Sequence, residues 1–473
     1  MKTVILDGRH DDGACAVLDA LLQELGSRGE KVQTFQLRDF KKMGSCIGCF
    51  ACWLKTPGIC VEADEGRKIA QAVAHSDTVI LLAPVTYGGY SSEIKKAQDR
   101  WIPLILPDFG VYHGEVHHKP RYDRYPRWIG IGLQVQPDDE EAHIFKTLVG
   151  RNALNFHAPS YAADVLLTFA SDATLHGKIQ DLLDRDDPFP LRKAITSLMP
   201  GAVEMDALPD AQHSRPADRS QRALLIVGSP KVSSPSTSGV LGDHVMKRLE
   251  KQGWETMTLT LRRGLLKDKG QAELLDAVER ADLIMLVFPL YIDSLPFLMM
   301  KALELIAGHF DGRPGDDPKG IAAIVNNGFP EAYHNAPAVA ICRRFAMDTG
   351  MTWMGGLAMG GGEALFRGQP FEKTNRNAPP VDHVKRALDL AADALANRQL
   401  IPVEAINLMK KTPIPIVPFR LWRWLFIRSA NQHWRREAAA HQVEPGAMRA
   451  QPYAEQAPAR SAPMANELST RIL

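Results

Sequence analysis

Short apolar runs and helical patterns alternate along residues 1–198. Runs typical of strands occur at residues 3–6, 32–37, 78–83 and 128–133, and a weaker one lies within 155–167. Apolar residues recur at helical spacing in 14–28, 67–75, 93–105, 138–149 and 174–183. The run at 78–83 shows no polar alternation, which is typical of a strand buried on both faces of a parallel sheet. Five strand–helix units in succession predict a parallel sheet covered by helices on both faces.

The alternation stops and then restarts. Residues 199–221 are rich in Pro, Ala, Asp and Ser, lack periodicity and are interpreted as a linker. Strand-like runs follow at 223–227, 256–261, 283–288, 321–325 and 353–358, with helical patterns at 239–252, 272–280, 298–306, 336–348 and 381–396. The sequence therefore predicts a long internal repeat: two tandem flavodoxin-like α/β domains, residues 1–198 and 222–400, each a doubly wound five-stranded parallel sheet.

Sheets of this type commonly have the strand order 2-1-3-4-5, which places ligands outside the carboxyl ends of strands 1 and 3. In the second half, the loop after the first strand is rich in hydroxyl groups and leads into a helix. Backbone N–H groups, hydroxyls and a helix N-terminus suit a phosphate monoester, although a turn that only caps the helix is the alternative. The candidate phosphate-binding residues are Ser229, Lys231, Ser236, Thr237 and Ser238, with Ser233 and Ser234 between them.

The loop after the third strand of each half offers a surface for a flat ring. Glycines permit close backbone approach, and tyrosines offer stacking faces. The candidate ring-facing residues are Pro289, Leu290 and Tyr291 in the second half, and Pro84, Thr86, Tyr87, Gly88 and Gly89 in the first.

The first half lacks hydroxyls in the turn after its first strand. Asp11 and Asp12 stand where a phosphate dianion would bind, and they would repel it unless Arg9 and His10 offset their charge. We therefore expect the first half to bind flavin weakly, to bind a ring without a phosphate, or to serve as an interface.

The chain resembles the NAD(P)H-dependent FMN reductase and flavodoxin-like oxidoreductase superfamily over most of residues 1–400. The resemblance lies in residues 46–53 with 56–60, in 84–92 leading to Asp99 and Arg100, and in 228–230. It implies that FMN is bound non-covalently and accepts a hydride from NAD(P)H, and that electrons pass onward to a small-molecule or protein acceptor. It also implies that Ser229, Lys231, Ser236 and Ser238 hold the phosphate and that the ring-facing residues flank the isoalloxazine. Since the flavin carries the chemistry, no dedicated catalytic acid or base is expected.

Four of the six cysteines lie in one loop: Cys46, Cys49, Cys52 and Cys60. In a reducing compartment this clustering suggests metal or redox chemistry before disulfides. The spacing resembles the compact motif of iron–sulfur flavoproteins, in which four thiolates hold a [4Fe–4S] cluster beside FMN. Cysteines without a cluster and a redox dithiol are alternatives, and zinc ranks low because its ligand pairs usually stand further apart. An FMN/[4Fe–4S] electron carrier without a nicotinamide site is thus the alternative to an NAD(P)H-dependent reductase.

The charges of the chain nearly balance: 56 basic and 55 acidic residues give a formal net charge of +1. The protein as a whole therefore has no strong electrostatic field of one sign. Nothing in this charge balance favours nucleic acid as a partner. No apolar stretch reaches the roughly 20 residues of a membrane-spanning helix, and no signal peptide is recognisable, so a cytoplasmic protein is expected. Because reductases of this kind often place flavin at a dimer interface, we expect the two domains to pack as an intramolecular pseudo-dimer.

Two segments lie outside the repeated pattern. An insertion carries Tyr112, His113, His117, His118, Tyr122 and Tyr125. No acidic residue there looks well placed for a metal site, so an aromatic lid or an interdomain contact is expected. Residues 401–441 are expected to form a helical extension, and 442–473 a disordered tail. Basic residues alternate with tryptophans in 419–428, and we expect this stretch to pack on the body in preference to a membrane interface.

Overall fold

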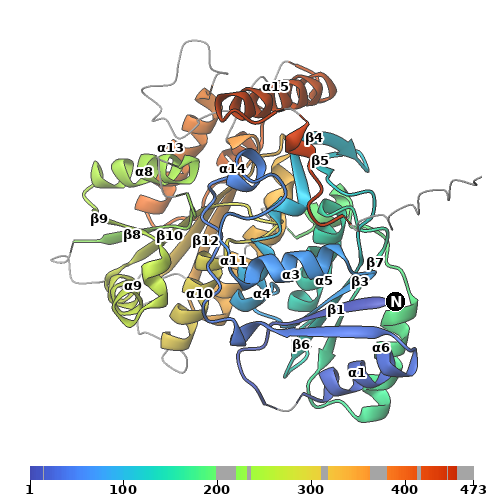
Figure 1. Ribbon diagram of the computed structural model, residues 1–473. Coiled ribbons are helices and arrows are strands. Elements are labelled where there is room, and N and C mark those ends of the chain that lie inside the picture. The colour runs from blue at the N-terminus through green and yellow to red at the C-terminus, as the bar shows by residue number, and fades with distance from the viewer. Residues whose placement is uncertain are drawn as a thin grey trace, which may run out of the picture.

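The structure is a computed structural model, which describes residues 1–13, 15–198, 220–231, 236–310, 318–362, 381–412, 417–444 and 446–454. Most of the expected linker and tail lies outside the described residues, as do Ser233 and Ser234. Two five-stranded parallel sheets form the framework, each flanked by helices (Figure 1). The predicted fold class is therefore confirmed.

The first sheet has the strand order β2-β1-β3-β6-β7. Its strands are β1 (Lys2–Asp7), β2 (Lys31–Gln36), β3 (Thr78–Pro84), β6 (Arg127–Gln134) and β7 (Tyr161–Leu167). One face packs on α1 (Ala16–Ser27) and α6 (Asp172–Asp184). The other packs on α3 (Glu65–Ala74), α4 (Ser92–Gln98) and α5 (Asp139–Asn155). Alternate strand residues supply the two cores, as the period of two in a strand requires.

The second sheet repeats this order as β12-β11-β10-β8-β9. Its strands are β8 (Arg222–Val227), β9 (Glu255–Thr260), β10 (Leu283–Pro289), β11 (Gly320–Asn326) and β12 (Thr352–Met359). On one face lie α8 (Thr237–Glu250), α13 (Asp382–Ala396) and α14 (Val403–Met409). On the other lie α9 (Asp268–Arg280), α10 (Phe297–Phe310) and α11 (Ala336–Asp348). In both sheets, the carboxyl ends of the first and third strands are neighbours, as the predicted order requires.

The two domains share one hydrophobic cluster, which joins the α3–α5 face of the first to the α9–α11 face of the second. Across this interface, α4 and α10 cap one another. Ser92, at the start of α4, donates from its backbone N and its Oγ to the Glu304 carboxylate at 2.6 Å each. Phe297, at the start of α10, donates from its backbone N to Asp99 Oδ2 at 2.7 Å. Because Asp99 and Glu304 each lie seven residues after the start of their helix, equal positions of the two domains meet, as in an isologous contact.

The helix predicted at 93–105 is shorter in the structure. α4 ends at Gln98, a 3-10 turn covers Ile102–Leu104, and the chain enters strand β4 (Ile105–Tyr112), which pairs in an antiparallel hairpin with β5 (Glu115–Pro120). Pro103 has no N–H to donate to the preceding helical turn, so the helix could not continue. Left-handed backbone at His113 and Gly114 closes the hairpin.

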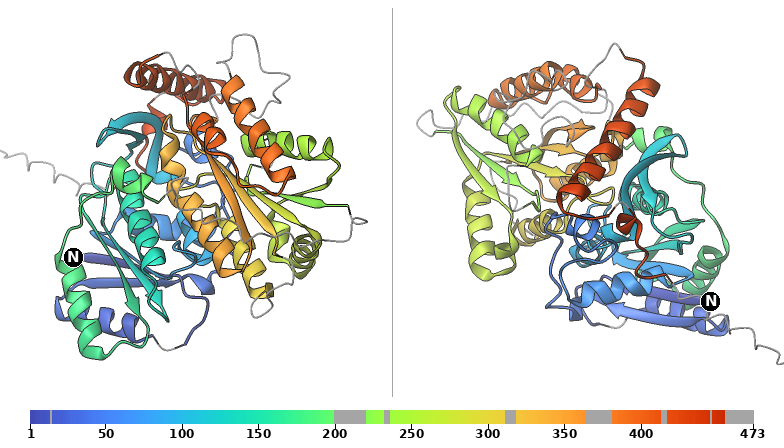
Figure 2. Two further views of the ribbon diagram at one scale, coloured as in Figure 1. Left: turned by 180° about the vertical axis from the view of Figure 1, so that it is seen from behind. Right: turned by 45° about the horizontal axis from the view of Figure 1, so that its top comes forward.

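The C-terminal extension contains the long helix α15 (Phe419–Ala440), which lies along the outside of the molecule over the β4–β5 hairpin (Figure 2). Its Trp422 and Phe426 pack on Phe109 of the hairpin and Phe329 of the second domain, so the expected packing on the body is observed. No helix among the described residues has the length and apolar character needed to cross a membrane. Short elements complete the described chain: α2 (Ala51–Leu54), α7 (Arg192–Thr196) and the 3-10 turns Leu37–Asp39, Arg263–Leu266, Ala332–Asn335 and Ala447–Arg449.

Candidate cofactor site between the two domains

In the predicted phosphate loop of the second domain, three of the described hydroxyls form hydrogen bonds within the protein. Ser236 is the N-cap of α8, and its Oγ accepts the Gly239 N–H at 3.0 Å. The Ser238 hydroxyl donates to Asn326 Oδ1 at 2.7 Å, and the Thr237 hydroxyl donates to the Gly362 carbonyl at 3.4 Å. An α-helix leaves its first N–H groups without helical partners. The feature that α8 offers to an anion is therefore its N-terminal backbone and dipole.

The ring-facing loop of the second domain is a strained turn. Tyr291 and Ser294 pair through both backbone bonds, at 2.9 and 3.1 Å, while Ile292 and Asp293 between them have φ values of 49° and 56°. Left-handed backbone is costly for a β-branched residue such as Ile292 and persists only where the surroundings fix it.

Side chains of the first domain fix this turn. From α5, Asn152 Nδ2 donates to the Ile292 carbonyl at 3.0 Å and to Asp293 Oδ2 at 3.1 Å. From α4, the buried ammonium of Lys95 donates to the Tyr291 carbonyl at 2.8 Å and pairs with Asp99 at 2.9 Å. The first domain therefore helps to shape the second domain's ring-facing loop.

The equivalent loop of the first domain is covered. Thr86 and Gly89 pair in the same manner, and Tyr87 has a φ of 55°. The Tyr87 ring stands edge-to-face on Phe345 of α11, with 5.2 Å between the ring centroids, and its burial raises the pKa of its hydroxyl. A Cβ added to Gly89 would lie 2.9 Å from Ile341 Cδ1. The Tyr87 ring, which was expected to stack on a flat ring, thus contacts Phe345 of the second domain.

The acidic turn after β1 also differs from the second domain's loop. Arg9 pairs with the buried Asp7 at 2.9 Å and donates to the Gly13 carbonyl at 2.7 Å. His10 faces Glu304 of the second domain at 3.3 Å, and the hydrogen bond to that carboxylate raises the His10 pKa. Arg9 and His10, the two residues that could have offset the charge of Asp11 and Asp12, therefore make their closest contacts elsewhere.

The cysteine loop converges through left-handed backbone. Gly48 has a φ of 61° and Phe50 a φ of 54°, and the Gly48 N–H donates to Cys46 Sγ at 3.4 Å. Burial raises the pKa of the Cys46 thiol to about 12 and that of Cys52 well above its usual value. All four predicted ligands, Cys46, Cys49, Cys52 and Cys60, are free thiols, and they lie close enough for their charges to interact.

The cysteine sulfurs are not spaced as ligands of a single zinc ion. Thiolates on one zinc ion, each at about 2.3 Å from the metal, lie about 4 Å apart. Among the described residues, no three of these cysteine sulfurs come within 4.8 Å of one another. A cubane places iron and sulfide between its thiolates and is favoured by N–H···S bonds such as that from Gly48. The structure thus places the four cysteines that the sequence singled out within electrostatic range of one another.

Two arginines stand beside the cysteines. Arg100 is buried, pairs with Asp64 at 2.8 Å, and interacts electrostatically with Cys60. Arg121 donates to the Pro103 carbonyl at 2.6 Å, and its charge reaches Cys52. Cations at this range would favour the negative charge of a metal–thiolate centre.

The cysteine loop touches both candidate loops of the second domain. A Cβ built on Gly48 would lie 2.8 Å from Tyr291 Oη, 3.4 Å from Pro230 Cγ and 3.6 Å from the backbone N of Lys231. Arg263 of the second domain adds a hydrogen bond to the Ser45 carbonyl at 2.8 Å. The cysteines of one domain therefore lie next to the strand-1 and strand-3 loops of the other.

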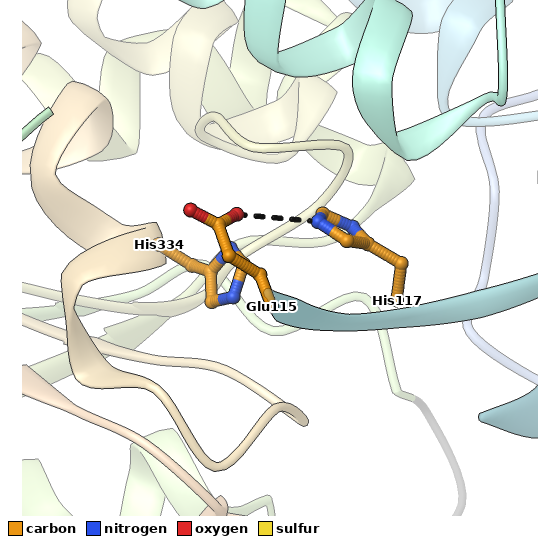
Figure 3. Close-up of side chains that lie close together, drawn as sticks. All are labelled: Glu115, His117 and His334. Atoms are coloured by element: carbon orange, nitrogen blue, oxygen red, sulfur yellow. Dashed lines mark hydrogen bonds and ion pairs between the residues drawn. The ribbon is translucent and has the colours of Figure 1, made fainter. Parts of the chain in front are cut away.

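A second buried cluster lies between the domains, where Glu115, His117 and His334 converge (Figure 3). His117 Nε2 lies 3.3 Å from Glu115 Oε2, and Arg151 Nη1 donates to the same oxygen at 2.6 Å. Sequence reasoning missed His334 and its neighbour Glu331, and the expectation that no acidic side chain in the insertion is well placed was wrong. Part of this cluster could have been found in the sequence, because Glu115 and His117 are two residues apart in a strand and therefore lie on the same face of it.

The hydrogen bonding of this cluster argues against a metal ion. Arg151 Nη2 lies 2.7 Å from His334 Nδ1, and an arginine only donates. The neutral imidazole of His334 therefore carries its hydrogen on Nε2, where it has no lone pair for a metal. Burial lowers the pKa of His334 to about 3, and burial also lowers that of His117. We interpret the cluster as an ion-paired network around Arg151.

Comparisons with known proteins bear on the first domain. Residues 1–120 match the family model described as NADPH-dependent FMN reductase, which confirms the predicted resemblance over that part of the chain. An iron–sulfur flavoprotein of Archaeoglobus fulgidus is 36% identical over 105 residues, which are 22% of this chain and 46% of that protein. An iron–sulfur flavoprotein of Methanocaldococcus jannaschii is 30% identical over 108 residues, 22% of this chain and 54% of that protein. The chain thus spans about half the length of these relatives.

A solved structure with a similar region is the NAD(P)H:quinone oxidoreductase from Methanothermobacter marburgensis. It is 12% identical and covers 40% of this chain and 98% of its own, with a TM-score of 0.31.

Proposed function

We propose that the chain, whose residues 1–120 match the family model described as NADPH-dependent FMN reductase, is an FMN-dependent oxidoreductase with a [4Fe–4S] cluster. The first domain would hold the cluster through Cys46, Cys49, Cys52 and Cys60, and the second would hold the FMN. The observation that carries this proposal is the contact of Gly48, between two of the cysteines, with Tyr291. Electrons would then pass between cofactors that belong to different domains.

Placing FMN in the second domain rests on the difference between the two switch points. The α8 N-terminus follows Ser229 and Lys231, which carry no negative charge, and a dianion gains from the helix dipole there. In the first domain, Asp11 and Asp12 occupy the corresponding turn, and Tyr87 packs on protein. We therefore expect one FMN in each chain.

The cysteine loop supplies what a cluster requires. The four thiolates would bind iron, the Gly48 N–H would bond to the Cys46 sulfur, and the cations Arg100 and Arg121 would stabilise the added negative charge. When bound, such a cluster transfers single electrons, whereas FMN exchanges either one electron or a hydride. Both relatives are named iron–sulfur flavoproteins, and that name supports the assignment of an iron–sulfur cluster and a flavin here.

The residues around the second-domain loop would orient the flavin. Lys95 and Asn152 of the first domain fix the turn at Tyr291 and Ile292, so the ring would meet a preorganised edge. The two domains would act as a pseudo-dimer, supported by the reciprocal capping of α4 and α10. NAD(P)H is the proposed hydride donor, supported by the description of the matching family. A small molecule or a protein would accept the electrons.

Anaerobic purification with iron, sulfide and flavin analysis tests the proposal. We expect about four iron atoms and one FMN for each chain. Cys49→Ser should lose the iron and keep the flavin, while the control Cys15→Ser, a free cysteine outside the loop, should keep both. Iron that survives Cys49→Ser, or a protein without iron after anaerobic reconstitution, would contradict the cluster.

The electron donor is tested separately by mixing the oxidised protein with NADPH or NADH under anaerobic conditions. Loss of the flavin absorbance within seconds of mixing would support an NAD(P)H-dependent reductase. A flavin that dithionite reduces and neither nicotinamide reduces would identify an electron carrier without a nicotinamide site.

A further inference from the structure

Helix α15 has two faces of different character. Its inner face buries Trp422 and Phe426 on the β4–β5 hairpin. Its other side exposes large apolar side chains: Leu421 is 49% exposed, Trp424 54% and Leu425 40%. Packing on the body therefore accounts for one face of the helix and leaves the other open.

The open face is continuous along the helix. Leu421, Trp424 and Leu425 are three and four residues apart, so they share one side of the first turns. The same spacing continues through Arg428, Arg435 and Arg436, all of them exposed. The Arg428 guanidinium lies 5.6 Å from the centroid of the Trp424 ring. The outward face thus joins an apolar and aromatic half to an arginine half.

The charge of α15 is local. The helix contains five arginines and one glutamate, while the whole chain has a net charge of only +1. Because the chain as a whole is nearly neutral, the positive charge of α15 indicates that this one surface binds anions. It does not indicate a general affinity of the protein for polyanions. Apolar and aromatic side chains beside arginines are the composition by which helices lie in the headgroup region of an anionic bilayer.

We propose that the open face of α15 docks on an anionic membrane surface. Leu421, Trp424 and Leu425 would enter the headgroup–acyl boundary, and Arg428, Arg435 and Arg436 would bind lipid phosphates. The helix is already held by its inner face, so docking would not bear the cost of folding it.

The inner face also touches the cysteine loop. Trp434 packs edge-on against Phe50 and Trp53, with ring centroids 5.5 and 5.1 Å apart. Docking would therefore hold the cysteine loop within about one helix diameter, about 10 Å, of the lipid headgroups. An electron partner in or on the membrane would meet the protein at this side.

Vesicle co-sedimentation of the full chain tests the proposal. The protein should pellet with phosphatidylcholine vesicles that contain about one-third phosphatidylglycerol and stay in solution with phosphatidylcholine alone. Leu421→Ser with Trp424→Ser should lower the partition coefficient at least about tenfold. Arg428→Gln, Arg435→Gln and Arg436→Gln together should lower it about a hundredfold.

Control variants make the same kinds of substitution, one residue at a time, outside α15. Phe169 is 62% exposed and lies outside α15, so Phe169→Ser should bind vesicles like the wild type. Arg280→Gln on α9 provides the control for charge. Circular dichroism should show that every variant keeps the native helix content.

Three results would overturn the proposal. In the first, the wild type would stay in solution with anionic vesicles. In the second, the α15 variants would bind these vesicles as well as the wild type does. In the third, light scattering would show a dimer that Trp424→Ser dissociates, which would identify a second copy of the chain as the occupant of this face.

Discussion

Replacing Glu331 by Gln would remove a titrating carboxyl from the network between the domains. Glu331 is 2% exposed; its Oε1 accepts the Val116 N–H at 3.2 Å, and its Oε2 lies 3.5 Å from His334 Nε2. Burial raises the Glu331 pKa from 4.5 to about 7. Glutamine has the shape of the protonated carboxyl and carries no charge at any pH, so the variant isolates the cost of ionising this side chain.

The magnitude follows from the two pKa values. A carboxyl whose pKa moves from 4.5 to about 7 on folding binds its proton about 3 kcal/mol more tightly in the folded protein. The native state then holds more protons than the unfolded chain between these values. The contribution of Glu331 to stability is therefore complete below about pH 4.5 and is lost as the pH rises through about 7.

The neighbouring Glu115 acts in a different window. Burial would raise its pKa, but the hydrogen bond from His117 and the charge of Arg151 outweigh burial and lower it to about 2. Its contribution is present above about pH 4.5 and is lost only as the pH falls toward about 2. A comparison of wild type and Glu331→Gln above pH 5 therefore reports on Glu331.

Urea unfolding followed by tryptophan fluorescence measures the effect at several pH values. Between about pH 5 and pH 8, the stability of Glu331→Gln relative to the wild type should rise by about 2 to 3 kcal/mol. The control Glu404→Gln makes the same substitution at an exposed position of α14. If the stability difference of Glu331→Gln were constant across this range, the reasoning about a buried proton at Glu331 would be wrong.

Two substitutions test the interface near the candidate cofactors. Asp99→Asn would leave the buried ammonium of Lys95 without its carboxylate at 2.9 Å, and urea unfolding should show a loss of about 3 kcal/mol; an unchanged stability would mean that the pair is not ionised. Gly48→Ala should raise the Kd of FMN, because the new Cβ would displace Tyr291 Oη. Gly58→Ala also adds a Cβ to left-handed backbone in the same loop, but that Cβ would meet Pro452 at 2.5 Å and no residue of the second domain, so its FMN titration should match the wild type.

The sheet framework could be predicted because its signal is local. Strands such as β3 and β10 are buried on both faces, and this requires unbroken apolar runs that remain visible in the sequence. The helix predicted at 93–105 was too long because apolar spacing continued past Gln98. There, Arg100 leaves the helical pattern to bind Asp64, and Pro103 prevents further helical bonds.

The candidate site was predictable only where its members are close in the chain. The four cysteines lie in one loop, and their spacing alone indicated a metal or redox site. Glu331 and His334 are more than 200 residues away from Glu115 in the chain. The sequence around η4 (Ala332–Asn335) contains no pattern from which their contact could be predicted. Arg151 reads in the sequence as an ordinary polar position of a helix, whereas the packing of the domains makes it the centre of the network.

The two domains have the same strand order, so fold does not explain why one would bind FMN and the other would not. The difference lies in a few side chains at equivalent positions. In the first domain the switch-point turn carries Asp11 and Asp12, and the Tyr87 ring packs edge-to-face against Phe345. In the second, the corresponding loop carries no acid before α8, and Tyr291 faces the cysteine loop. If both domains bound FMN, only one of the two flavins would lie next to the cysteine loop, because the chain has a single such loop and it contacts the second domain. A measured ratio of one FMN to one chain would therefore support a division of labour, in which one copy of the fold became the cluster domain and the interface for the other.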